Sequence, residues 1–244
     1  MAGIIKLKNI SFIAQDRIIV RNFSHEFEEG KTTALVGPSG CGKSTLLKLS
    51  AGILVPREGE VFFRDRDIFS MSRQETLDFR REASMVFQDS ALWANQNLFQ
   101  ILELPLRIHY PGMSQQEREN RIQVVLRDVG YKRDLSIRPS LLSMGEQKLI
   151  AFARAMMCHP RLLFLDEWTE SLDDSAAQRL IQLVQRHQRD NHTVIFVSHD
   201  FRIVKSLADY ILMILGGQFF LKLSRQQMEE DEDLARYVER GIAS

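Results

Sequence analysis

One segment of the chain matches the phosphate-binding pattern G-x-x-x-x-G-K-[ST] in full. It consists of Gly37, Pro38, Ser39, Gly40, Cys41, Gly42, Lys43, Ser44 and Thr45. The glycines let consecutive backbone N–H groups turn inward around phosphate oxygens. Lys43 is expected to neutralise the β and γ phosphates of a nucleotide, and the Ser44 hydroxyl to ligate Mg²⁺. The segment predicts a nucleoside triphosphate site, although a kinase, a GTPase or a motor would carry the same pattern.

Two acids follow the apolar run at residues 162–165. Asp166 can hold Mg²⁺ through a water molecule, opposite Ser44. Glu167, one residue further on, points elsewhere and can polarise an attacking water as a general base. An isolated acid pair at a strand end is more often a helix cap or a surface charge. Because a phosphate loop lies upstream, we interpret this pair as functional, with Asp166 as a residue of the ATP and Mg²⁺ site and Glu167 as a catalytic residue.

Two further polar residues close apolar runs. His199 follows residues 194–197, the next apolar run after Asp166, and is expected to contact a γ-phosphate. Gln88 closes the run at residues 84–87, where it could reach both Mg²⁺ and the attacking water. In isolation the histidine would be a satisfied buried residue, and the glutamine an ordinary strand-end residue. The other histidines have no such setting, and we assign them no role.

Hydrophobic periodicity indicates the elements that position these side chains. Residues 32–36, 162–165 and 194–197 form continuous runs, typical of central strands in a sheet covered on both faces. Ligands of α/β sheets bind at the carboxyl ends of such strands, where the polar residues lie. Residues 20–27 alternate as in a half-buried antiparallel strand, and residues 1–9 also read as a strand.

Helical spacing replaces the strand signal between about residues 89 and 160. It is clearest at residues 115–129 and 147–157, which predicts a helical insertion inside an α/β core. After residue 223, an acidic stretch precedes apolar residues at helical spacing. This tail is either a solvated amphipathic helix or a docking element.

Composition excludes several classes of protein. Of 244 residues, 32 are Lys or Arg and 32 are Asp or Glu, which argues against a protein that coats nucleic acid. Two cysteines are too few for a disulfide framework, so the cytosol is the expected compartment. Cys41 occupies a position of the phosphate-binding pattern that accepts any residue, so a redox role for it is not expected. The apolar runs are far shorter than the roughly 20 residues of a membrane-spanning helix.

The segment Leu141-Leu142-Ser143-Met144-Gly145-Glu146-Gln147 precedes a predicted helix. With the phosphate loop (Walker A), Gln88 (Q-loop), residues 162–166 (Walker B), residues 171–173 (D-loop) and His199 (H-switch), it resembles the ATP-binding-cassette (ABC) ATPases. The order and spacing of these motifs extend from about residue 4 to residue 223. The resemblance implies an α/β fold, a P-loop NTPase (RecA-like) core with an antiparallel β subdomain and an inserted α-helical subdomain.

The resemblance also implies a domain division and a mechanism. A single ABC ATPase domain would span residues 1–224, with its core at 1–88 and 159–224 and a helical subdomain at 89–158, before a helical tail at 225–244. Two copies would sandwich two ATP molecules with Mg²⁺. Each nucleotide would lie between the phosphate loop of one copy and Ser143 and Gly145 of the other. Ser143 and Glu146 also fit a capping box, a purely structural interpretation that can coexist with the functional one.

Three departures from the family pattern stand out. The usual signature is Leu-Ser-Gly-Gly-Gln, whereas Met144 and Glu146 here place an extra carboxylate near the partner's phosphate, which would allow slower turnover or a regulated site. Leu149 stands where many relatives carry arginine. The family's adenine-stacking aromatic aligns with Ala14, so stacking must come from Phe12 or from weaker contacts such as Ile19. We expect reduced selectivity for adenine.

Two classes of function fit such an ATPase. One is the energy subunit of a membrane transporter, peripheral at the cytoplasmic face of the inner membrane and without a nucleic-acid partner. The other is a soluble ATPase of translation or DNA repair, which usually has two cassettes or long insertions that this chain lacks. Permease subunits would contact residues 89–110. The apolar residues proposed for that contact are Leu92, Trp93, Leu98, Phe99, Leu102 and Leu104. The alternative for some of them is packing within the helical subdomain.

Residues 97–109 and the helix predicted at 231–242 are similar to the ATPases of the Mla/MCE phospholipid-transport systems. This similarity implies a phospholipid cargo moved between bacterial membranes, with MCE-domain proteins and other lipid-transport subunits as partners. Importers of small solutes and lipoprotein-release systems remain the alternatives.

Overall fold

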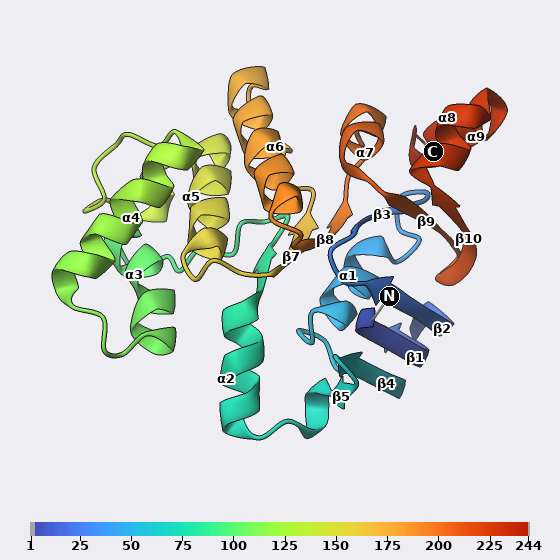
Figure 1. Ribbon diagram of the computed structural model, residues 1–244, viewed down its shortest axis with the longest axis horizontal. Helices are drawn as coiled ribbons and strands as arrows, with labels where there is room; N and C mark the ends of the chain where they lie inside the picture. Colours follow the sequence, from blue (N-terminus) through green and yellow to red (C-terminus); the bar gives the residue numbers. More distant parts are fainter. Residues whose placement is uncertain (1–2, 244) are drawn as a thin grey trace. The chain divides into compact units, whose positions relative to one another are not determined.

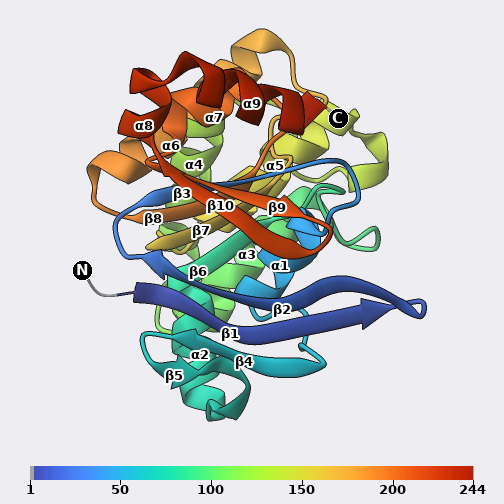
Figure 2. The ribbon, with the colours of Figure 1, turned by 90° about the vertical axis from the view of Figure 1, so that its right-hand side faces the viewer.

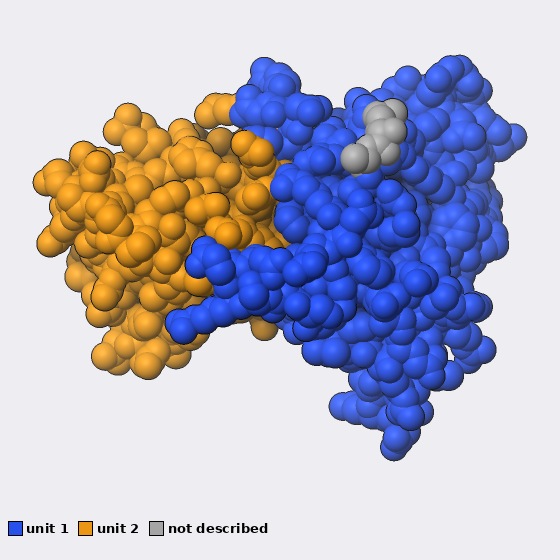
Figure 3. Space-filling view, turned by 60° about the horizontal axis from the view of Figure 1, so that its bottom comes forward, with its two compact units in different colours: residues 1–76, 188–244 blue, residues 77–187 orange. Residues whose placement is uncertain are grey.

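The computed structural model describes residues 3–243, which divide into two compact units (Figure 3). Unit 1 comprises residues 1–76 and 188–244, and unit 2 comprises residues 77–187. Their boundaries fall within α2 (Arg73–Glu82) and α6 (Asp174–Arg189). The domain division at residues 89–158 and 225–244 stays a prediction. The first two residues of the strand predicted at 1–9 and the last residue of the tail lie outside the described residues.

Unit 1 contains an antiparallel sheet with the strand order β2-β1-β4-β5 (Figure 2). Its strands are β1 (Gly3–Ala14), β2 (Arg17–Glu28), β4 (Glu58–Phe63) and β5 (Arg66–Asp67). Alternation along β2 buries Phe23 and Phe27, as its sequence pattern predicts. β1 continues well past residue 9 and stays paired with β2 as far as Ala14, with register shifts after Leu7 and Ile10 among others.

A second set of strands in unit 1 follows the order β10-β9-β3-β8. They are β3 (Thr32–Val36), β8 (Thr193–Val197), β9 (Tyr210–Leu215) and β10 (Gln218–Ser224). β3 pairs in parallel with both β8 and β9. Every residue of β3 and β8 is buried, which explains why both lack the polar alternation of an exposed strand. The strands predicted at residues 32–36 and 194–197 are therefore confirmed.

Helices cover the strands of unit 1. They are α1 (Lys43–Ser50), α7 (Phe201–Leu207), α8 (Arg225–Glu230) and α9 (Glu232–Ala243), with a 3₁₀ turn at Ile68–Ser70. α1 contacts both sets of strands, since it touches β8 on one side and β1 and β2 on the other. α9 lies where the sequence predicts a helix at residues 231–242. Its Val238 is fully buried, and the ring of Tyr237 lies 6.3 Å from that of Phe220, so the tail packs on its own unit.

Unit 2 combines a parallel strand pair with a helical cluster (Figure 1). The strands are β6 (Ala83–Val86) and β7 (Leu162–Asp166). The helices α3 (Leu98–His109), α4 (Gln115–Val129) and α5 (Met144–Met156) pack on one another, with a 3₁₀ turn at Pro139–Leu141. Residues 89–158, all of them described, contain helices and loops and no strand. The predicted helical insertion is confirmed.

Candidate nucleotide-binding site

The phosphate loop connects β3 to α1 within unit 1. The backbone angle φ is 146° at Gly37, 75° at Gly40 and 100° at Gly42, a region that favours glycine. A Cβ on Gly42 would lie 2.7 Å from the carbonyl oxygen of Ile19, whereas a Cβ on Gly40 would meet nothing within 4 Å. The N–H of Cys41 donates to the carbonyl of Pro38 at 3.2 Å and closes the turn. These residues form the curled backbone that a phosphate group requires.

Lys43 is the cation of this loop. Its Nζ donates to the carbonyl oxygens of Gly37 at 2.7 Å and Pro38 at 2.9 Å, and the residue is only 6% exposed. α1 begins at Lys43, and the preceding Gly42 provides no side-chain cap for the first turn. First-turn N–H groups and the positive end of a helix dipole suit phosphate oxygens. The residues present therefore fit a triphosphate, with Lys43 able to exchange its carbonyl partners for phosphate oxygens.

Ile19 lies beside the phosphate loop. Its carbonyl oxygen approaches Gly42 and Gly217, and its Cγ2 would lie 3.5 Å from a Cβ on Gly42. Phe12, the other residue considered for base stacking, pairs with Val20 across β1 and β2. An aliphatic side chain offers dispersion contacts but no aromatic ring for stacking. The expectation of reduced selectivity for adenine, with base contacts from Phe12 or Ile19, stays a prediction.

The two acids of unit 2 lie at the end of β7. Asp166 is its last residue and is fully buried, and Glu167 follows at 8% exposure. Glu167 has a φ of 43°, the left-handed region that residues other than glycine rarely adopt. The chain therefore turns sharply at this residue, so the two carboxylates do not continue the alternation of a strand. Unusual backbone conformations of this kind cluster at functional sites.

Gln88 lies two residues beyond β6 in the same unit. It is exposed, and its Nε2 donates to Oε2 of Glu170 at 3.2 Å. Glu170 belongs to the loop that Glu167 begins. The structure thus joins the Q-loop glutamine to the loop of the candidate general base through a direct side-chain contact.

Two cations from α5 hold the backbone that follows β6, and the sequence patterns did not reveal them. Lys148 Nζ donates to the carbonyl oxygens of Phe87, at 3.5 Å, and Gln88. Arg154 donates to the carbonyl oxygens of Ser90 at 3.2 Å and Ala91 at 2.6 Å. Helical spacing could have indicated that Lys148 is buried, because position 148 shares one face of α5 with positions 152 and 155, which are apolar.

Lys148 is a buried charge, at 3% exposure. Burial lowers the pKa of its ammonium group, and four nearby acids oppose that shift. They are Glu170, Asp166, Asp89 and Glu167. A positive charge at this position therefore offsets the repulsion among the carboxylates at the end of β7.

Replacing this charge tests its role. We expect Lys148→Met to lower the free energy of unfolding by about 1–2 kcal/mol, because two partly buried carbonyls lose their charged donor. Lys148→Gln keeps one donor and should lose less. Urea unfolding followed by circular dichroism measures both variants. A change within about 0.5 kcal/mol for Lys148→Met would show that the contact contributes nothing.

His199 follows β8 in unit 1 and is exposed. The next residue, Asp200, accepts a hydrogen bond from the backbone N–H of Arg202 at 2.8 Å and starts α7. His199 therefore occupies the short loop between a buried strand and a helix, as the sequence predicts. In contrast, His25 packs against Phe27 with ring centroids 4.7 Å apart. Burial lowers the pKa of His25 to about 4, so it is neutral at pH 7, in agreement with a structural role.

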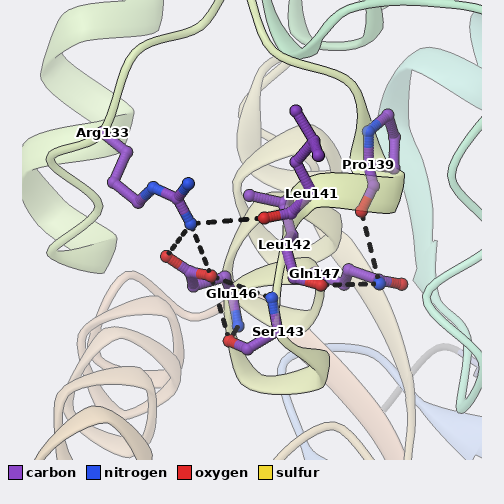
Figure 4. A network of polar contacts seen from close by, with 7 residues as sticks. All are labelled: Arg133, Pro139, Leu141, Leu142, Ser143, Glu146 and Gln147. Carbon is purple, nitrogen blue, oxygen red and sulfur yellow. Dashed lines mark hydrogen bonds and ion pairs between the residues drawn. The ribbon is translucent and has the colours of Figure 1, made fainter.

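The signature turn begins α5 in unit 2 (Figure 4). The Ser143 side chain accepts from the N–H of Glu146, and the Glu146 carboxylate accepts from the N–H of Ser143 at 2.9 Å, so the capping box is present. A Cβ on Gly145 would lie 2.9 Å from the carbonyl oxygen of Ser171, so the neighbouring D-loop requires glycine here. Met144 is 71% exposed. The turn has a structural role and still lies at the surface.

These motifs agree with a comparison against known families. The model of the family described as ABC transporter matches residues 20–170, which is more than half of the chain. The chain belongs to the ABC transporter ATPases. As a member of this family, it is an ATPase and the ATP-binding subunit of a transporter.

Individual relatives of this ABC ATPase fall into several transport systems. The intermembrane phospholipid transport system ATP-binding protein MlaF of Haemophilus influenzae is 34% identical, over 95% of this chain and 88% of its own length. The methionine import ATP-binding protein MetN of Rhodopseudomonas palustris is 36% identical, over 78% of this chain and 51% of its own. The chain therefore spans about half the length of that second relative.

A solved structure confirms the fold of this ABC ATPase. The dimeric post-hydrolysis state of the cassette MJ0796, bound to ADP and Pi, has a TM-score of 0.83 at 28% identity, over 91% of this chain and 98% of that one. The predicted P-loop NTPase core, with its antiparallel β subdomain and helical insertion, is confirmed. Cassettes of this family dimerise and work with membrane permeases.

The six apolar residues expected to contact a permease differ in their exposure to solvent. Leu98 and Leu102 are fully buried within unit 2, so these two residues pack within the helical subdomain and form the buried face of α3. Trp93 is 45% exposed, and the guanidinium of Arg154 lies 5.4 Å from the centroid of its ring. Leu92, Phe99 and Leu104 are half-buried. Trp93 is thus the most accessible of the six.

Proposed function

We propose that two copies of this chain close around two ATP molecules with Mg²⁺ and thereby drive phospholipid transport between bacterial membranes. In each composite site, residues 37–45 hold the triphosphate. Ser143 and Gly145 of the second copy would complete the site. ATP hydrolysis then removes the ligand that joins the copies.

Each functional residue has a separate task in this proposal. Ser44, Asp166 and Gln88 would hold Mg²⁺, which when bound neutralises charge on the phosphate oxygens. Glu167 takes a proton from the attacking water as general base. His199 donates a hydrogen bond to the γ-phosphate. Lys43 compensates the remaining phosphate charge.

Exposure of the signature turn supports the two-copy arrangement. Ser143 is exposed, and its neighbours Leu141 and Met144 are 63% and 71% exposed. A turn packed inside its own subunit could not meet a second copy. Large exposed apolar side chains on both sides of a helix N-terminus are suited to a surface that is covered during the catalytic cycle.

The proposal of a phospholipid cargo is based on how much of each relative's length the chain matches. The match to MlaF, whose name states intermembrane phospholipid transport, covers almost all of both chains, whereas the match to MetN covers about half of the relative. A relative that matches over almost its whole length supports a shared role better than one that matches over half. Solute import is the second candidate, because the percentage identity to MetN is equally high.

We also propose that the chain works at the cytoplasmic face of the inner membrane, attached to permease subunits through residues 89–110. None of the described helices is long and apolar enough to cross a bilayer. Membrane attachment in this proposal therefore comes through a partner. Exposed Trp93 is suited to a contact with a helix of the permease.

Affinity purification from native membranes tests the proposal. Under it, the tagged chain brings down a permease, an MCE-domain protein and bound phospholipid, all identified by mass spectrometry. Trp93→Ala should reduce the recovered permease, whereas Val124→Ala, at an equally exposed apolar residue on α4, should not. A solute-binding protein in place of the MCE-domain protein would contradict the lipid cargo. Co-sedimentation with ribosomes would contradict transport altogether.

A further inference from the structure

The carboxylate that departs from the family signature does not stand alone. Arg133, in the loop between α4 and the 3₁₀ turn, directs its Nη1 at Glu146, 2.9 Å from Oε1 and 3.0 Å from Oε2 (Figure 4). The same nitrogen lies 3.4 Å from the carbonyl oxygen of Leu141. One guanidinium therefore contacts both the carboxylate inside the signature turn and the backbone that leads into it.

Glu146 is held from two sides. Its Oε2 accepts from the backbone N–H of Ser143 at 2.9 Å and from the Ser143 hydroxyl at 3.0 Å. These bonds and Arg133 together lower the pKa of Glu146, with the backbone N–H as the largest cause. The carboxylate raises the pKa of Arg133 in return. Both groups are therefore charged at neutral pH.

A charged carboxylate at this position opposes anion binding. A helix N-terminus attracts anions through its N–H groups and its partial positive charge, and a unit negative charge in the first turn cancels that attraction. The proposed function requires a triphosphate, itself strongly negative, to approach Ser143. Arg133 contacts both oxygens of Glu146, and its positive charge neutralises the negative charge of this carboxylate at the turn.

We propose that Arg133 is a positioning residue of the ATPase reaction, which neutralises Glu146 and so keeps the N-terminus of α5 attractive to the triphosphate carried by a second copy. This inference rests on the proposed nucleotide sandwich. It replaces the expectation that Glu146 by itself slows turnover. The pair is partly exposed, with side-chain exposures of 50% for Arg133 and 26% for Glu146, so dissolved ions have access to it.

Three variants separate charge compensation from simple support of the loop. Arg133→Ala leaves the carboxylate uncompensated and should lower kcat/KM for ATP about two- to fivefold, the size expected of one exposed charge near a helix N-terminus. Glu146→Gln keeps the capping box, since glutamine serves at this position as well as glutamate, and should retain at least native activity. The double variant should recover the rate of Glu146→Gln. If it stays as slow as Arg133→Ala, the inference is wrong.

The dependence of the ATPase rate on salt distinguishes charge compensation by Arg133 from a purely structural role. The defect of Arg133→Ala should shrink between 0.05 and 0.5 M KCl, concentrations chosen because the Debye length falls well below about 10 Å over that range. Arg133→Lys keeps the charge and should show less of the defect. A defect independent of salt and equal in the alanine and lysine variants would overturn the inference. Thermal unfolding of each variant identifies any that fail to fold.

The ATP-dependent dimer distinguishes failure of this inference from failure of the proposed function. In a Glu167→Gln background, Arg133→Ala should weaken ATP-dependent dimerisation about two- to fivefold by sedimentation velocity, and adding Glu146→Gln should restore it. If the Glu167→Gln parent does not dimerise with ATP, the nucleotide sandwich and the inference are both wrong. If the parent dimerises and Arg133→Ala changes nothing, only the inference is wrong.

Discussion

Glu167→Gln should abolish ATP hydrolysis by this chain while leaving nucleotide binding intact. The amide is nearly the same size as the carboxylate but cannot accept a proton from water. Loss of a general base typically costs a factor of about 10²–10⁴ in rate. Steady-state phosphate release measures the loss, and binding of a fluorescent ATP analogue checks that the site is preserved.

The position of Glu167 makes this substitution informative. The residue is almost fully buried and follows β7 in a left-handed conformation, so a change of size would disturb packing, whereas the amide keeps the shape. Asp174→Asn is a matched control, because it neutralises an exposed acid at the start of α6 a few residues later. The control should keep its turnover. Turnover near the native rate in Glu167→Gln would refute the assignment of Glu167 as the base.

Lys43→Ala should weaken ATP binding about 100-fold, since removing one partner of a buried, charge-assisted contact typically costs 2–5 kcal/mol. The ammonium group bridges Gly37 and Pro38 within the loop and lies where the β and γ phosphates are expected. Equilibrium binding of a fluorescent ATP analogue measures the loss. ADP, with one phosphate fewer, should lose less affinity than ATP.

Lys48, in the last turn of α1, provides the control for Lys43→Ala. Lys48→Ala also removes one positive charge, but from the last turn of α1, where the helix dipole is negative. Its affinity for ATP should stay within about threefold of the native value, as expected of a charge far from the ligand. Equal losses in the two variants would mean that overall charge, and not the position of Lys43, governs binding.

The strands that lead to the site were predictable because a strand buried on both faces has a continuous run of uncharged, mostly apolar residues. β3 and β8 contain no charged residue and are buried throughout, and residues 162–165 read the same way before Asp166. The phosphate loop was equally clear, because its glycines, Lys43 and Ser44 have a fixed spacing. Helix α4 was predicted from its apolar spacing alone and has the predicted bounds.

Contacts between residues far apart in sequence could not be predicted in the same way. Lys148 meets the Q-loop backbone across about 60 positions, and no periodicity links two such segments. Arg133 reaches Glu146 because a loop of irregular shape returns to α5, and the conformation of such loops is set by tertiary packing. Whether Leu98 and Leu102 face outward was also undecided in sequence, since an apolar residue of an amphipathic helix suits either a core or a docking surface.

Sedimentation velocity of the Glu167→Gln chain with ATP and Mg²⁺ shows directly whether ATP joins two copies. We expect a species of twice the chain mass that retains two ATP molecules, and monomer when ADP replaces ATP or when Lys43→Ala is added. Monomer under all of these conditions, or a dimer that forms equally well without nucleotide, would contradict this expectation.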